Sequence, residues 1–284
     1  MEKGVEMKVL ELHKNENAEF RTGQTVPHKS PNIRESCMLS VEGEVVGFYL
    51  KETPKDLKVL CNLVNDQFRS KDVPKTQLKR TDVLAKKIKY NTDYATSLKM
   101  GTVQLSTIIG LMPPRPLFKR LKAAPSRVHF HKKAKTYIKA MMMLGQECEK
   151  VIKELMPKQY EKQVEIIKEN TPEGLGFLDM FTSNIANYNI AAPFHRDTGN
   201  LKHTVNAIVT KRHNASGGNL YVPEYDACFE QADRSLLVYP AWRNVHGVTK
   251  INIQKENAYR NSFIFYPVAG LLRDYSVEKK EEES

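Results

Sequence analysis

Two histidines, an aspartate and an arginine in the second half of the chain could together hold a metal ion and an acidic cosubstrate. His195 and Asp197 are one residue apart, His246 follows the aspartate by 49 residues, and Arg260 follows that histidine by 14. Two residues separated by a single residue on an extended strand point to the same face, so His195 and Asp197 can bind one ion. Two imidazoles and one carboxylate can occupy one face of Fe(II) and leave three positions for a cosubstrate and dioxygen. Arg260 could pair with the far carboxylate of a dicarboxylic acid, so the pattern indicates a 2-oxoglutarate-dependent iron oxygenase.

Strand-like segments surround these residues. Runs rich in β-branched and aromatic residues cover 204–210, 235–239 and 261–266. An isolated His-x-Asp pair is also common in surface turns, but here the ligands and Arg260 lie at strand ends, where a barrel could bring them together. A protein-kinase interpretation of His-Arg-Asp fails, because Lys202 stands where a kinase has its metal-binding asparagine.

The order of patterns along the chain predicts an α+β fold. Residues 1–35 are polar and aperiodic and are expected to form a flexible arm. Two strands are expected around the Glu42-Gly43 turn, helices after Pro54, over 132–156 and over 158–168, and short strands with a bend at Gly217-Gly218 beyond Gly174. We therefore expect one catalytic domain over 36–275. It would combine a helical, basic support region (36–173) with a double-stranded β-helix, or jelly-roll, core (174–270) carrying the iron site, followed by a disordered tail (276–284).

Composition is that of an ordinary globule, with 40% hydrophobic residues and one tryptophan in 284 residues. No segment has the pattern of a signal peptide or a membrane span, so we expect no membrane partner. We also expect the protein to be a monomer. Its location would be the cytoplasm of a bacterium or phage host, or the nucleus in a eukaryote. The four scattered cysteines are expected to be buried, reduced thiols rather than zinc ligands: Cys37, Cys61, Cys148 and Cys228.

Positive charge is concentrated in one segment. Residues 71–135 hold 16 lysines and arginines against three acids, whereas the whole chain carries a net charge of only +11. Such a concentration is typical of a surface that binds a phosphate backbone, although lysines that merely solvate helix faces would give the same count. The candidate backbone contacts are Lys79, Arg80, Lys86, Lys87, Lys89, Lys119, Arg120 and Lys122.

At the candidate ligands, the sequence resembles the TET/JBP family of nucleic-acid-base dioxygenases, over roughly residues 177–270. The segment from His195 to Asn200 resembles the family's His-Arg-Asp-x-x-Asn motif, and His246-Gly247-Val248 resembles its distal iron ligand. The segment from Arg260 to Tyr266 resembles its Arg-x-Ser-x-x-Phe-Tyr strand. The resemblance is to a compact member of microbial or phage type, because the cysteine-rich zinc region of animal members is absent.

This resemblance implies a role for each matching residue. His195, Asp197 and His246 would bind iron, while Arg260 and Ser262 would hold 2-oxoglutarate. Asn200 would face the target base, and Tyr266 would stack on it after it is flipped out of double-stranded DNA. From the residues alone, Asn200 could instead close the turn after the ligand pair, and Tyr266 could be a core aromatic.

The implied reaction is oxidation of the 5-methyl group of a pyrimidine in DNA by Fe(II), 2-oxoglutarate and dioxygen, with ascorbate as an activator. The family histidine that contacts the amine of cytosine is Val268 here. The contact that favours cytosine over thymine is therefore not guaranteed. The resemblance implies 5-methylcytosine as the first substrate, oxidised to 5-hydroxymethylcytosine or further, and thymine is the second. The alternatives are a 2-oxoglutarate hydroxylase of proteins or small molecules, and a non-catalytic nucleic-acid-binding jelly roll.

Overall fold

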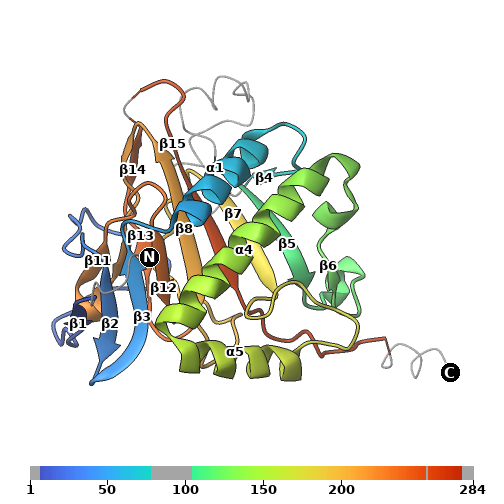
Figure 1. The fold of residues 1–284 in the computed structure, drawn as a ribbon, viewed down its shortest axis with the longest axis horizontal. Helices are drawn as coiled ribbons and strands as arrows, with labels where there is room; N and C mark the ends of the chain where they lie inside the picture. Colours follow the sequence, from blue (N-terminus) through green and yellow to red (C-terminus); the bar gives the residue numbers. More distant parts are fainter. Residues whose placement is uncertain (1–6, 78–103, 254, 277–284) are drawn as a thin grey trace.

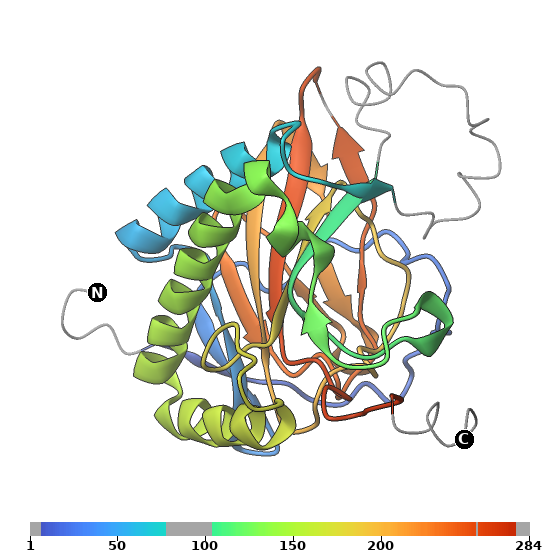
Figure 2. The ribbon, with the colours of Figure 1, turned by 90° about the vertical axis from the view of Figure 1, so that its right-hand side faces the viewer.

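The computed structural model describes residues 7–77, 104–253 and 255–276. In these residues a large sheet has helices on one face and two smaller sheets beyond its other face (Figure 1). Seen at 90° to that view, the helices form a layer along one side of the strands (Figure 2). None of the helices in the described ranges is long and apolar enough to cross a bilayer.

The large sheet joins strands from both ends of the chain. Its order is β1-β2-β3-β12-β8-β15-β7-β5-β4, with β6 paired to β5. These strands are β1 (Val9–Glu11), β2 (Cys37–Val41), β3 (Glu44–Leu50), β4 (Thr76–Gln77), β5 (Leu105–Met112), β6 (Ala124–Pro125), β7 (Ser183–Tyr188), β8 (Asn206–His213), β12 (Leu236–Tyr239) and β15 (Tyr259–Tyr266). The three predicted strands nearest the ligands are thus confirmed as β8, β12 and β15, which are neighbours in the sheet.

Alternation along β15 directs its side chains to two different surroundings. Phe263 and Phe265 lie in the core cluster under the helices and are fully buried. Ile264, between them, packs against the cluster shared with the smaller sheet. Since successive strand residues point to opposite faces, Arg260 and Ser262 share the face of Ile264. The strand therefore aims both residues into the space between the sheets.

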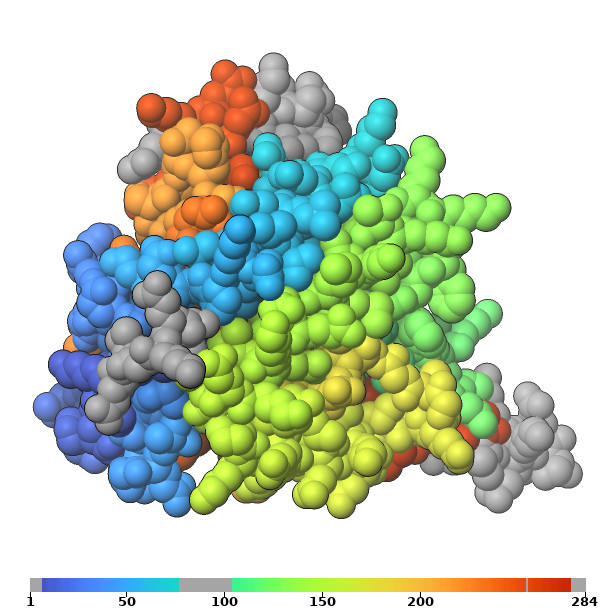
Figure 3. All heavy atoms as spheres, viewed as in Figure 1, coloured from blue at the N-terminus to red at the C-terminus, as the bar shows by residue number. Residues whose placement is uncertain are grey.

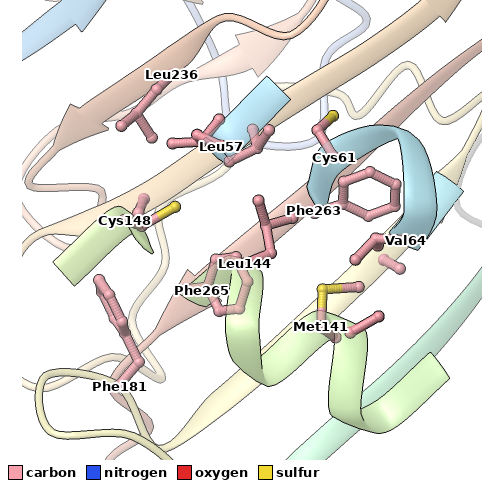
Figure 4. Close-up of a cluster of buried hydrophobic side chains, with 14 of the residues drawn as sticks. Leu57, Cys61, Val64, Met141, Leu144, Cys148, Phe181, Leu236, Phe263 and Phe265 are labelled. Atoms are coloured by element: carbon pink, nitrogen blue, oxygen red, sulfur yellow. The ribbon is translucent and has the colours of Figure 1, made fainter. Parts of the chain in front are cut away.

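Three helices follow the predicted pattern: α1 (Lys55–Arg69), α4 (Lys135–Leu155) and α5 (Pro157–Asn170). Leu57 and Cys61 of α1 and Leu144 and Cys148 of α4 lie in the same apolar cluster as Phe263 (Figure 4). In the space-filling view, the three helices cover the middle and lower part of the visible face, with N-terminal segments (blue) at its left and C-terminal segments (orange) at its upper left (Figure 3). All four cysteines are free and buried, as expected.

The smaller sheets complete the jelly roll. One has the order β11-β10-β13, with β10 (Leu220–Val222), β11 (Ala227–Phe229) and β13 (Gly247–Val248), and the other pairs β9 (Ala215–Gly217) with β14 (Ile251–Ile253). Leu220 and Phe229 pack against Ile208 and Leu237 of the large sheet. The predicted bend is present: Gly217 has φ +69°, and a Cβ there would lie 2.1 Å from the carbonyl oxygen of Lys250. The predicted α+β jelly-roll class is confirmed.

The N-terminal half contributes more to the sheet than its predicted supporting role. From residue 7 onward the expected arm is packed: β1 pairs with β2, and the N–H of Phe194 donates to Gln24 O at 2.9 Å. Strands β2 and β3 confirm the two strands expected around the Glu42-Gly43 turn, whereas β5 was not predicted. All three belong to the large sheet although they precede residue 173, so a boundary at that residue does not separate the sheet. Strand β5 was missed because an apolar run alone does not distinguish a strand from another buried segment, and its pairing depends on the distant β7. The expected tail lies, from residue 277, outside the described residues.

Candidate active site

His195 and His246 face each other across an isolated antiparallel bridge. Each N–H donates to the other residue's carbonyl oxygen at 2.8 Å, and the ring centroids are 4.4 Å apart. His246 immediately precedes β13, so the short sheet fixes its backbone. Asp197 lies two residues beyond His195, and its Oδ1 is 3.5 Å from the Nε2 of that histidine.

These three side chains could hold one metal ion. One ligand atom from each residue lies within 4.8 Å of the others. The Nδ1 of His195 lies 2.8 Å from the carbonyl oxygen of Pro193, and the Nδ1 of His246 lies 3.2 Å from that of Asn244. A carbonyl accepts only, so each Nδ1 carries the proton and each Nε2 keeps its lone pair for a metal. The donor set, two neutral imidazoles and one carboxylate, suits Fe(II).

Burial favours the neutral, metal-binding form of His246. Its side chain is only 5% exposed. Burial holds the pKa of His246 well below its ordinary value, and the nearby His195 lowers it further. An imidazole in such surroundings stays unprotonated at neutral pH, as a metal ligand must.

Sequence reasoning missed Asn206, which connects the candidate ligand Asp197 to Asn200. The Nδ2 of Asn206 donates to Asp197 Oδ2 at 3.1 Å, and Asn200 Nδ2 donates to Asn206 Oδ1 at 2.9 Å. Both asparagines are buried, at 1% and 8% exposure. The available signal was an amide immediately before the apolar run Ala207-Ile208-Val209, at the start of a strand, where asparagine is disfavoured.

Arg260 is a buried cation with little to balance its charge. Its side chain is 2% exposed, its Nη2 lies 3.5 Å from Gln231 Oε1, and none of the described residues accepts from its Nε. Burial, and then the positive charge of Arg212, lower the pKa of Arg260 to about 9. A buried guanidinium without a counterion is unfavourable, so the site is suited to an anion.

Gln231 and Arg212 surround that cation and were not singled out from the sequence. Gln231 is fully buried and accepts from the hydroxyl of Thr210 at 2.7 Å. Arg212 is the cross-strand partner of Arg260 and donates to the carbonyl oxygen of Gln231 at 3.0 Å. Glycine at position 218 leaves room for this arrangement, because a Cβ there would lie 3.3 Å from Arg260 Cδ.

The structure brings some of the remaining candidates together. Ser262 is 2% exposed on the same face of β15 as Arg260, and Tyr266 ends that face half-buried. Val268 forms a backbone bridge with Asn200. The position that carries a histidine in the resembled family is therefore next to Asn200.

The candidate phosphate contacts are only partly described. Lys119 is exposed, Arg120 Nε donates to the carbonyl oxygen of Pro113 at 2.6 Å, and Lys122 pairs with Asp274 at 3.0 Å. Lys79, Arg80, Lys86, Lys87 and Lys89 lie outside the described residues.

Comparison with known structures supports the fold. The structure of NgTET1 in complex with 5mC DNA matches with a TM-score of 0.54 at 12% identity, covering 98% of this chain and 91% of that chain. A 2OG-Fe(II) oxygenase-family oxidoreductase from Burkholderia pseudomallei matches with a TM-score of 0.46 at 12% identity, covering 84% and 96%. At 12% identity, the first of these matches shows a shared fold and nothing finer. No curated protein matches the sequence.

The sequence match to a family is more direct. The model of the Tet/JBP family, described as the oxygenase domain of the 2OGFeDO superfamily, matches residues 119–268, which is more than half of the chain. The match contains all three candidate metal ligands and Arg260 and begins well before the motifs that first indicated it. This chain therefore belongs to the Tet/JBP family and is an oxygenase that uses Fe(II) and 2-oxoglutarate.

Proposed function

We propose that this protein oxidises the 5-methyl group of a pyrimidine in DNA, with 5-methylcytosine as its first substrate. The observation that carries the proposal is the neighbourhood of Asn200. This amide is hydrogen-bonded through Asn206 to Asp197, and its backbone pairs with a C-terminal segment that continues to an exposed basic loop. A metabolite hydroxylase needs the metal and the cosubstrate site but no adjoining basic surface.

In this proposal His195, Asp197 and His246 hold Fe(II). Bound together, Fe(II) and 2-oxoglutarate allow dioxygen to oxidise an unactivated C–H bond, yielding succinate and carbon dioxide, and ascorbate would keep the iron reduced. Arg260 holds the distal carboxylate of 2-oxoglutarate, and Ser262, two residues along the same face, hydrogen-bonds to it. Because Arg260 is buried at 2% exposure, water competes little for this pair.

A base must leave the helix to reach this cluster. A methyl group inside a duplex cannot approach a metal between two sheets, so the nucleotide has to be flipped out. Asn200 would then contact the polar edge of the flipped base, and the ring of Tyr266 would stack on its face. Tyr266 suits this role because it lies at the end of β15 and is half-buried.

The exposed loop formed by residues 113–121 is suited to duplex DNA. Its backbone is closed by Arg115 N–H donating to Arg120 O at 2.6 Å, and its tip exposes 94% of Leu117 and 63% of Phe118. The guanidinium of Arg115 lies 4.3 Å from the centre of the Phe118 ring. No Asp or Glu occurs between Asp93 and Glu147. Cations around an apolar tip fit phosphates beside a disturbed base stack.

The C-terminal segment links this loop to the candidate base pocket. The N–H of Ala269 donates to Gly199 O at 2.8 Å, and the N–H of Tyr275 donates to Leu121 O at 3.0 Å. The stretch from Ala269 to Tyr275 therefore contacts both the turn that carries Asn200 and the end of the basic loop. A duplex lying over the loop could then deliver a flipped base toward Asn200.

Thymine is the second candidate because of Val268. Its backbone pairs with Asn200, and its side chain offers no hydrogen bond to a base. The exocyclic amine of cytosine therefore loses one acceptor that the resembled family supplies.

The test is mass spectrometry of nucleosides from matched methylated and unmethylated duplexes treated with enzyme, Fe(II), 2-oxoglutarate and ascorbate. The proposal expects 5-hydroxymethylcytosine from the methylated duplex only, and none with the His246→Ala variant. Oxidised thymine in both duplexes without oxidised 5-methylcytosine would support the second candidate. Unchanged nucleosides in both would contradict a DNA substrate.

A further inference from the structure

Asn206 is in an unusual position for a polar side chain, since it lies between a candidate metal ligand and a candidate substrate contact. It begins β8, is 1% exposed, and uses both ends of its amide: its nitrogen donates to Asp197 Oδ2 and its oxygen accepts from Asn200 Nδ2. The two hydrogen bonds measure 3.1 Å and 2.9 Å.

The direction of this chain of hydrogen bonds is fixed at one end. A carboxylate that binds a metal is ionised and can only accept, so Asn206 must turn its NH2 group toward Asp197. Its carbonyl oxygen then faces Asn200, which must donate its own NH2 group to it. An amide can normally be placed either way round, but here neither asparagine can flip without opposing two acceptors or two donors.

The backbone of Asn200 is held as firmly as its side chain. Its N–H donates to Asp197 O at 3.0 Å, and on either side Leu201 N–H donates to Pro267 O at 2.9 Å and Ala269 N–H to Gly199 O at 2.8 Å. One of the two N–H groups of the Asn200 amide is used by Asn206, and no described residue donates to Asn200 Oδ1. The side chain therefore has a carbonyl oxygen left to offer.

We propose that Asn206 is a positioning residue that makes Asn200 present a hydrogen-bond acceptor to the flipped base. An acceptor matches the exocyclic amine of cytosine and opposes the carbonyl that thymine carries at the same ring position. The two hydrogen bonds that join Asp197, Asn206 and Asn200, here called the relay, would thus replace the acceptor lost at Val268 and select 5-methylcytosine. This inference rests on the proposed function and adds to it the residue that sets base preference.

The test compares wild type with Asn206→Leu, which keeps the volume and removes both hydrogen bonds. Two duplexes are used that differ only in whether the single target base is 5-methylcytosine or thymine, at saturating Fe(II) and 2-oxoglutarate. A lost or reversed hydrogen bond in a dry pocket should lower the 5-methylcytosine-to-thymine ratio of kcat/KM by about tenfold. Iron affinity, measured separately by metal titration, should also weaken, because Asp197 loses a partner.

A matched control removes a buried amide elsewhere on the same sheet. Asn261, on the helix-facing side of β15, donates to Asn65 Oδ1 at 2.9 Å and is fully buried. The Asn261→Leu variant should leave the base ratio as in wild type. Should Asn206→Leu fail to fold, Asn206→Ser removes the bridge with a smaller polar side chain, and the same fall in ratio is expected.

The outcomes separate this inference from the function beneath it. If wild type oxidises 5-methylcytosine and Asn206→Leu and Asn206→Ser keep the wild-type ratio, the relay does not set base choice. A ratio that rises instead of falling would show that Asn200 donates to the base. If wild type oxidises neither pyrimidine, the proposed function itself fails.

Discussion

The two faces of strand β15 differ in chemistry although they belong to one run of eight residues. Toward the helices, Phe263 and Phe265 are fully buried among apolar side chains (Figure 4). Toward the smaller sheets, Arg260 and Ser262 are almost as deeply buried, at 2% each, but are polar. Because strand side chains alternate, one segment can stabilise the fold with one face and carry chemistry with the other. Substitutions on the two faces should therefore have separable effects.

The largest separation is expected between His246 and Phe263. The His246→Ala variant should lose measurable turnover and keep its fold, because one metal ligand is lost from an otherwise intact pair of sheets. The Phe263→Leu variant should do the reverse, losing about 1 kcal/mol of stability while retaining turnover. Succinate formation and thermal unfolding, measured on both proteins, test this. Substantial 2-oxoglutarate decarboxylation by His246→Ala would show that the ligand assignment is wrong.

Substitution of Arg260 should have a smaller effect on function, and it should weaken cosubstrate binding while stabilising the unbound protein. Removing one partner of a buried charge pair costs about 2–5 kcal/mol, so Arg260→Leu should raise the KM for 2-oxoglutarate by about 30-fold or more. Without cosubstrate the same variant should unfold at a higher temperature than wild type, because a poorly balanced buried charge is gone. Calorimetric binding and thermal unfolding give both values. A variant that binds 2-oxoglutarate normally would separate Arg260 from the cosubstrate.

On the helix side, Glu149 of α4 should make stability depend on pH. Its side chain accepts from Met180 N–H at 2.6 Å, and burial raises its pKa from 4.5 to about 7. The folded state thus holds this proton more tightly than the unfolded state. Its contribution, about 3 kcal/mol at most, is complete below pH 4.5 and is lost as pH rises through 7.

The Glu149→Gln variant keeps the acceptor without the charge. Its free energy of unfolding at pH 8 should exceed that of wild type, and the difference should shrink toward pH 5. Denaturant unfolding of both proteins across this range measures the difference. A constant difference would mean that Glu149 titrates normally.

The smallest effect is expected in the basic loop. Lys119 is exposed with no ion pair among the described residues, whereas Lys122 is 3.0 Å from Asp274. If Lys119 contacts a phosphate, Lys119→Gln should reduce the slope of log K against log salt by about 0.9. The matched Lys122→Gln change should reduce it less. DNA binding measured at several salt concentrations decides this, and equal slopes for all three proteins would leave these lysines as solubilising charges.

Sequence patterns were enough to predict the helices and strands whose conformation is set by the spacing of residues within one segment. The helices around Leu57 and Leu144 have an apolar stripe with helical spacing, and the ligand strands alternate clearly. The three candidate metal ligands could be singled out because only one residue separates His195 from Asp197 and because His246 follows a recognisable strand.

Residues that depend on a distant partner could not be predicted. Asn206, Gln231 and Arg212 acquire their roles from contacts with residues of other segments. The only local signal among them is the amide of Asn206 at the start of β8. The same holds for residues 7–35. Their order comes from pairing with β2 and from hydrogen bonds to Phe194, rather than from any periodicity of their own.

We propose that the three candidate metal ligands, Arg260 and Asn200 act together on one flipped base. The most direct measurement is the amount of succinate formed per oxidised base on a duplex carrying a single 5-methylcytosine, with ascorbate present. Coupled action predicts nearly equal amounts of succinate and 5-hydroxymethylcytosine early in the reaction, and neither product with His246→Ala. Succinate released at the same rate with and without this duplex, while its 5-methylcytosine stays intact, would contradict the account.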